Sequence, residues 1–179
     1  MKKIIAFTGP AGAGKDECVK YLVGQHGFTR LAFAKGLKDM LAAIGISEPP
    51  TQAEKEEVIP ALGRSYRYMA QTLGTEWGRK LIHDDLWVKI AEARMGAEFG
   101  AKGHAISDLR FENEATMVRH IGGVIVHLKG RKDAMADGTK AHASEAGIVY
   151  MDTDITVHND VDNLGALHRK LDLALRHVL

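Results

Sequence analysis

The sequence has 179 residues, enough for one α/β domain with a well-buried core and too few for two domains of ordinary size. Its 24 Lys and Arg residues nearly balance its 23 Asp and Glu residues, so no overall positive charge favours a nucleic acid as partner. The single cysteine, Cys18, excludes an internal disulfide framework and a cysteine-based zinc site. No stretch approaches the length of a membrane span, and the composition is typical of a cytoplasmic protein.

A glycine-rich turn, Gly9-Pro10-Ala11-Gly12-Ala13-Gly14-Lys15-Asp16, follows a short apolar run that predicts a first strand rather than a signal peptide. A helical pattern continues directly from this turn. Strand, glycine-rich turn, lysine and helix is the arrangement of a phosphate-binding loop, because glycines let consecutive N–H groups point into one concavity. Lys15 would supply a mobile cation that reaches the β- and γ-phosphates of a nucleotide.

The residue after Lys15 departs from the usual pattern. Ser or Thr is common there and its hydroxyl binds Mg²⁺, whereas this chain has Asp16 followed by Glu17. A carboxylate at this point could hold the metal directly or through water, or it could simply favour the helix N-terminus electrostatically. The sequence leaves these interpretations open.

The first half of the chain predicts further elements in order. Gly27 ends the first helix, and residues 28–33 form a short strand. Apolar residues at helical spacing predict a helix over 37–44, followed by a loop over 45–53 and a short acidic helix over 54–58. Because Gly74 and Gly78 interrupt residues 65–82, we expect two short helical pieces there. A helix over 86–99 follows, with Asp85 as its N-cap.

The second half predicts a strand at 104–107, a helix at 111–121 and a buried strand at 124–128. Residues 129–144 are polar and without periodicity, which favours a lid. The last elements are a strand at 154–157 and a helix at 164–178. Five strands alternating with helices predict one α/β domain over 1–179, a five-stranded parallel sheet flanked by helices, with its site at the carboxyl ends of the strands.

Three groups of side chains beyond the loop carry candidate chemistry. Asp108 and Arg110 follow a strand, where an acid could hold Mg²⁺ and a guanidinium could neutralise phosphate, although Asp108 could equally cap the next helix. The stretch with Gln71, Trp77 and Arg79 offers groups for a phosphate and a base, or else a solvated helix face over a core. Cations on the lid, Arg131 among them, could close over a triphosphate. The nine His residues are scattered without metal-ligand spacing.

With these residues in view, most of the chain resembles the deoxynucleoside monophosphate kinases of bacteriophages, a branch of the P-loop nucleoside monophosphate kinases. In this branch an Asp similarly tends to follow the loop lysine. Its Phe-Ala-x-Pro-Leu-Lys motif has proline where this chain has Gly36. The pieces that carry the resemblance are Gly14-Lys15-Asp16, Phe33-Ala34-Lys35-Gly36-Leu37-Lys38, Gln71-Thr72-Leu73-Gly74-Thr75-Glu76-Trp77-Gly78-Arg79, Asp108-Leu109-Arg110-Phe111-Glu112-Asn113-Glu114 and His142-Ala143-Ser144-Glu145.

The resemblance implies phosphorylation of a deoxynucleoside 5′-monophosphate to its diphosphate, with ATP as donor and Mg²⁺ as cofactor. It implies an acceptor-binding helical region over about 34–99 and a lid over about 129–144. It leaves a homodimer open. The implied site residues are Gly12, Ala13, Gly14, Lys15, Asp16 and Glu17 for the donor, Lys38, Gln71, Trp77, Arg79 and Arg110 for the acceptor, Lys15, Asp108, Arg110 and Arg131 for catalysis, and Asp16 and Asp108 for the metal.

Other functions compete with this one. Dephospho-coenzyme A kinase resembles the same fold and also has a phosphate loop and a lid. From a different class, a nucleotide-hydrolysing regulatory protein would use the same loop, although the chain has no Asn-Lys-x-Asp motif for guanine. A nucleic-acid-binding module is disfavoured by the near-neutral charge.

Overall fold

The computed structural model describes residues 3–97, 102–130, 148–161 and 163–179. The chain divides into two compact units. Unit 1 comprises Met1–Ala32 and Arg94–Leu179, and unit 2 comprises Phe33–Ala93. Unit 2 has bounds close to those expected for the acceptor-binding region. Among the described residues, no helix is both long and apolar enough to cross a membrane.

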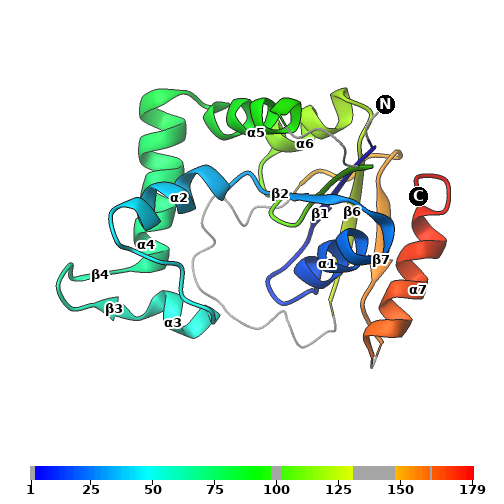
Figure 1. Ribbon diagram of the computed structural model, residues 1–179, viewed down its shortest axis with the longest axis horizontal. Coiled ribbons are helices and arrows are strands. Elements are labelled where there is room, and N and C mark those ends of the chain that lie inside the picture. The colour runs from blue at the N-terminus through cyan, green and yellow to red at the C-terminus, as the bar shows by residue number, and fades with distance from the viewer. Residues whose placement is uncertain (1–2, 98–101, 131–147, 162) are drawn as a thin grey trace. The chain divides into compact units, whose positions relative to one another are not determined.

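Unit 1 is built on a five-stranded sheet in the order β2-β5-β1-β6-β7, in which every pairing is parallel (Figure 1). This confirms the predicted fold class. The five strands are β1 (Lys3–Thr8), β2 (Thr29–Leu31), β5 (Gly103–Ile106), β6 (Val124–Lys129) and β7 (Ile155–His158), and the helices of unit 1 are α1 (Lys15–His26), α6 (Glu112–His120) and α7 (Leu164–Leu175).

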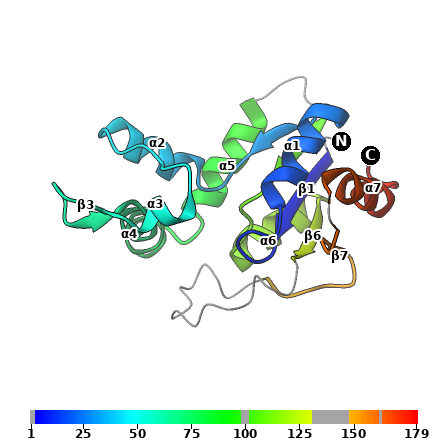
Figure 2. The same cartoon turned by 90° about the horizontal axis from the view of Figure 1, so that it is seen from below.

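Alternation along β1 assigns its side chains to two faces of the sheet. Ile5 and Phe7 are fully buried in one cluster with residues of α1 and α7. On the other face, a Cβ on Gly123 would lie 2.8 Å from Val118 of α6 and 3.1 Å from Ile4, so Ile4 and α6 share that face. Figure 2 accordingly shows α1 and α7 on one side of the sheet and α6 on the other. The layers are thus helix, sheet and helix, and every strand is covered.

A polar cluster joins α1 to α7. The Tyr21 hydroxyl donates to Asp172 at 2.6 Å, and His26 lies 3.1 Å from the other oxygen of the same carboxylate. His168 stacks on the Tyr21 ring at a centroid distance of 4.0 Å. The hydrogen bond to Asp172, together with burial, raises the pKa of Tyr21 to about 12, so the phenol stays a donor at neutral pH. This cluster fixes the helix that begins at the glycine-rich loop.

Unit 2 is mainly helical. Its apolar cluster contains Leu37, Leu41, Tyr66 and Trp87. The unit also has a hairpin of two short antiparallel strands that the sequence did not predict. Its elements are α2 (Lys35–Ala43), α3 (Gln52–Glu56), β3 (Val58–Ile59), β4 (Arg64–Ser65), α4 (Tyr66–Gln71) and a π-helical stretch η1 (Thr72–Ile82), and α5 (Leu86–Ala97) begins in this unit.

The predicted helix at 54–58 lies two residues too far along the chain. Thr51 caps α3, because its hydroxyl accepts from the N–H of Glu54 while the Glu54 carboxylate accepts from the N–H of Thr51. This reciprocal cap sets the start of the helix at Gln52.

The two helical pieces expected in this stretch are present as α4 and η1, but the change between them falls at Thr72 and not at Gly74 or Gly78. Helical residues continue without a break from Tyr66 to Ile82, and only the hydrogen-bonding pattern changes, at Thr72. The glycines make room for Trp87 instead. A Cβ on Gly78 would lie 2.6 Å from the indole ring, and the indole N–H donates to the Gly74 carbonyl at 2.8 Å. Gly36 belongs to the same packing, since a Cβ there would approach Trp87 to 3.2 Å.

We predict that Asp172→Ala destabilises the protein by about 1 kcal/mol, because the Tyr21 hydroxyl loses its acceptor. Urea unfolding followed by circular dichroism measures this change. Asp152→Ala removes an exposed carboxylate from the turn before β7 and serves as the control. Equal unfolding free energies for the two variants would show that the cluster contributes nothing to stability.

Candidate active site

The glycine-rich loop leaves the carboxyl end of β1 and leads into α1. Its backbone takes conformations that few other residues adopt, with φ of 137° at Gly9 and 100° at Gly14. A Cβ on Gly9 would lie 2.1 Å from the carbonyl oxygen of Leu128 on β6, so the chain can start the loop here only with glycine. The sequence prediction of a strand, a glycine-rich turn and a helix is confirmed.

Lys15 folds back onto the loop. Its ammonium group donates to the carbonyl oxygens of Gly9 and Pro10, each at 2.7 Å. Burial lowers the pKa of Lys15 to about 8, and the positive charge of Arg110 contributes to this shift. Two cations from separate segments of unit 1 therefore act on each other at the loop.

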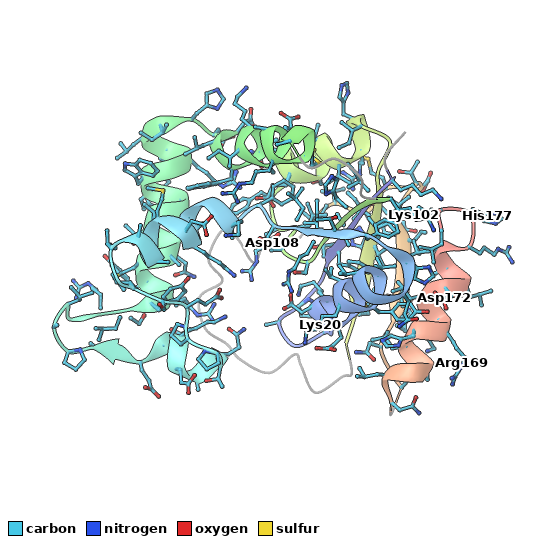
Figure 3. All side chains as sticks on the ribbon, viewed as in Figure 1. Lys20, Lys102, Asp108, Arg169, Asp172 and His177 are labelled. Atoms are coloured by element: carbon cyan, nitrogen blue, oxygen red, sulfur yellow. The ribbon has the colours of Figure 1, made fainter. Side chains whose placement is uncertain are left out.

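Asp108 and Arg110 follow β5, which pairs with β1 in parallel, so both lie at the same edge of the sheet as the loop. Asp108 is labelled in Figure 3. Asp108 is half-buried and Arg110 is exposed. The alternative role of Asp108 as a helix cap is wrong, because α6 begins at Glu112 with Phe111 as its N-cap.

Glu114 supports this turn. Its carboxylate accepts from the backbone N–H groups of Arg110 at 2.9 Å and Phe111 at 3.1 Å. The side chain is buried, so these bonds form in a low-dielectric surrounding where they are strong. Glu114 thus fixes the backbone from which the Arg110 side chain projects. The spacing Asp108-x-Arg110-x-x-x-Glu114 contains this signal, but no local pattern assigns Glu114 to these N–H groups.

Asp16 is held by two residues that sequence reasoning missed. Ser107 donates to Asp16 at 2.8 Å, and Arg30 of β2 donates both to the same carboxylate oxygen and to the Ser107 hydroxyl. Asp16 and Glu17 lie in the first turn of α1, where negative charge is favourable. Glu17 also accepts from Lys20 at 2.6 Å.

Four of the five predicted acceptor residues lie in unit 2, whereas Arg110 lies in unit 1. Lys38 forms an ion pair with Glu48 at 2.8 Å, and Glu48 also binds Lys55. Burial opposes ionisation of Glu48, but these two lysines outweigh it and hold its pKa below the usual value. Trp77 is partly exposed and lies 6.5 Å from the Trp87 ring, whereas Arg79 is buried and donates to the Asp84 carbonyl at 3.0 Å. Gln71 ends α4 and is half-buried.

Some predicted features lie outside the described residues. Arg131 and most of the lid at 129–144 belong to them, as does the His142-Ala143-Ser144-Glu145 motif. Within the described part of the chain, no cluster of three or more His, Cys, Asp or Glu side chains could hold a metal. Cys18 is buried, and burial raises the pKa of its thiol to about 12, which keeps it unreactive.

A parallel sheet covered by helices, a glycine-rich loop with a lysine, and an acid and an arginine at the neighbouring strand end define an α/β kinase, a phosphotransferase. A protein-family model described as deoxynucleotide monophosphate kinase matches residues 55–171. The chain belongs to the deoxynucleotide monophosphate kinase family. This confirms the resemblance found in the sequence.

Individual relatives agree with the family. The chain is 27% identical over 164 residues, 79% of this chain and 80% of the relative, to a protein of Acanthamoeba polyphaga mimivirus whose description as a deoxynucleotide monophosphate kinase is itself inferred. It is 38% identical over 65 residues to the deoxynucleoside-5′-monophosphate kinase of Escherichia phage T5, covering 36% of this chain and 26% of the phage enzyme. A solved sugar kinase from Janibacter sp. HTCC2649 has a TM-score of 0.49 at 13% identity, over 98% of this chain and 95% of its own.

We predict that the affinity for ATP falls as the pH rises above about 8. Lys15 with a pKa of about 8 is protonated below that pH and can bind phosphate, and it loses its charge above it. Titration calorimetry from pH 7 to pH 9.5 measures the dissociation constant for ATP, whose rise approaches tenfold per pH unit above the pKa of Lys15. Lys15→Arg keeps its charge and is the control; a decline of the same size in that variant would assign the effect to another group.

Proposed function

We propose that this chain transfers the γ-phosphoryl group of ATP to a deoxynucleoside 5′-monophosphate. The observation that supports this most directly is the electrostatic interaction of Lys15 with Arg110 beside the glycine-rich loop, in a member of this kinase family. Two like charges close together destabilise each other until an anion binds between or beside them. The site is thus suited to a polyphosphate.

The donor is assigned to residues 12–17. Backbone N–H groups of the loop and of the first turn of α1 would bind phosphate oxygens, with the positive end of the helix dipole behind them. Lys15 would leave the carbonyls of Gly9 and Pro10 and follow the phosphate. Because these two hydrogen bonds satisfy the ammonium in the meantime, the partly buried cation is stabilised before the nucleotide arrives.

Asp108 and Arg110 are assigned to the transfer itself. Phosphoryl transfer needs positioning and charge stabilisation more than covalent chemistry, so Arg110 would stabilise charge on the transferring group. Asp108 would hold the metal or orient the attacking oxygen. The buried carboxylate of Glu114 keeps the backbone of Arg110 in place and so limits the reorganisation needed at the moment of transfer.

Mg²⁺ is the proposed cofactor. The carboxylate of Asp16 and the hydroxyl of Ser107 are hard oxygen donors 2.8 Å apart, which fits the chemistry that Mg²⁺ prefers. Arg30 now donates to both groups, and Mg²⁺ would have to displace its guanidinium from the Asp16 carboxylate. When bound, the metal would neutralise charge on the phosphates.

The acceptor monophosphate is assigned to unit 2, through Lys38, Gln71, Trp77 and Arg79. Trp77 offers a partly exposed ring for stacking on a base, and Arg79 offers a planar fork for a phosphate. Lys38 would exchange its Glu48 partner for the acceptor. Because the proposed reaction uses ATP and free deoxynucleotides, we propose that the protein acts in the cytoplasm, that of a host cell if the chain is phage-encoded.

A coupled assay for ADP release, run over deoxy- and ribonucleoside monophosphates and dephospho-coenzyme A, tests this function. We expect turnover with one or more deoxynucleoside monophosphates and a loss of at least about 100-fold in Lys15→Ala, because a cation that meets the transferring phosphate is removed. Lys20→Ala removes an exposed cation from the same helix and should keep its activity.

Three outcomes would contradict the proposal. Turnover of dephospho-coenzyme A alone would assign the rival kinase. Slow hydrolysis of ATP that no acceptor accelerates would point to a regulatory protein. Unchanged turnover in Lys15→Ala would remove the loop from the reaction.

We predict that Arg79→Lys raises KM for the monophosphate about tenfold, because lysine keeps the charge but loses the two-pronged hydrogen bonding. KM for ATP should change less than twofold in a steady-state assay in which each substrate is varied in turn. Lys80→Ala is the control, since Lys80 is the exposed neighbour that pairs with Glu76. Equal increases in both KM values would exclude Arg79 from the acceptor site.

A further inference from the structure

Asn159 connects the far end of the sheet to the glycine-rich loop. It follows β7 directly, and its backbone N–H donates to the carbonyl of Lys129, the last residue of β6, at 2.8 Å. Its side-chain amide donates to the carbonyl oxygen of Ala13 at 2.9 Å. One residue is therefore fixed to the sheet by its backbone and to the loop by its side chain.

The bond to Ala13 sets the direction of the next N–H group. The peptide between Ala13 and Gly14 is planar and trans, so the Gly14 N–H points opposite to the Ala13 carbonyl. With that carbonyl held on Asn159, the N–H is turned away from Asn159 and toward the side on which the loop offers its donors to phosphate. Without the bond to Asn159, the peptide between Ala13 and Gly14 could rotate. The Gly14 N–H would then no longer point at the phosphate.

Packing around Gly14 supports the same arrangement. Gly14 has φ of 100°, and a Cβ on it would lie 2.8 Å from the Asn159 amide nitrogen and 3.7 Å from Leu167 of α7. Leu167 is buried in the core of unit 1. The Asn159 amide and the Leu167 side chain thus both occupy the space that a Cβ on Gly14 would need, so the amide lies directly against the glycine.

We infer that Asn159 is a positioning residue for phosphate binding, which aims the Gly14 N–H at the polyphosphate by holding the Ala13 carbonyl. The inference rests on the proposed function, in which this loop binds ATP. In this role Asn159 does not contact the nucleotide base. It acts through the loop, so it affects the binding of any ligand that carries the phosphates.

The experiment compares Asn159→Leu, which keeps the size but has no donor, and Asn159→Ala with the wild type. Titration calorimetry gives dissociation constants for ATP, ADP and inorganic tripolyphosphate. We expect about five- to tenfold weaker binding of all three by the Leu variant, the range of one lost hydrogen bond. KM for the monophosphate should stay within twofold. Thermal unfolding of each free protein shows whether the variant folds. If the Leu variant does not fold, the Ala variant is used for the test.

Asp160→Ala is the matched control, since Asp160 lies in the same turn but pairs with Lys170 on the outside of α7. It should bind all three ligands like the wild type. Weaker binding of ATP and ADP with unchanged binding of tripolyphosphate would overturn the inference in favour of a base contact. Unchanged binding of all three would overturn it while the proposed function stands, and a wild type that binds neither ATP nor tripolyphosphate would overturn both.

Discussion

The glycine-rich loop depends on the parallel pairing of β1 with a strand on each side. β5 and β6 hold β1 in register, with Thr8 opposite His127, and the chain must leave the sheet directly beside the backbone of Leu128. Only glycine fits at this exit. Because all five strands run the same way, the turns after β5 and β7 open at the same edge, so Asp108 and Asn159 come to the loop from distant parts of the sequence.

Charge at this edge is arranged in two ways. Lys15 and Arg110 oppose each other, and the cost is limited because Lys15 binds two carbonyl oxygens of its own loop. Asp16 is instead paired with Arg30 and Ser107, all in unit 1. The first group is prepared for an anion and the second is already neutralised. An exposed ion pair such as Asp16 with Arg30 contributes little to stability and can therefore exchange partners at low cost.

Apolar runs, periodicity and turn residues were sufficient to predict the five strands and most helices, because each depends on local patterns such as the apolar run of β1 or Gly27 at the end of α1. The loop and Lys15 followed from a short motif. The partners of Asp16 did not, since Ser107 is 91 residues away and meets it only through the strand order. The unbroken passage of η1 through Gly74 and Gly78 was not predicted, because the space that these glycines leave is filled by Trp87, which no local pattern reveals.

The motif on which the resemblance rests has proline at the position of Gly36. The first turn of a helix tolerates proline, so the backbone of α2 alone does not require glycine here. Trp87 favours glycine, because a Cβ at this point would lie 3.2 Å from its ring and the ring would have to shift by a few tenths of an ångström. The two positions are therefore coupled through shared volume, and relatives that keep the proline are expected to carry a slimmer side chain in place of the tryptophan. Changing either position singly would crowd or hollow the core of unit 2, whereas a paired exchange would preserve it.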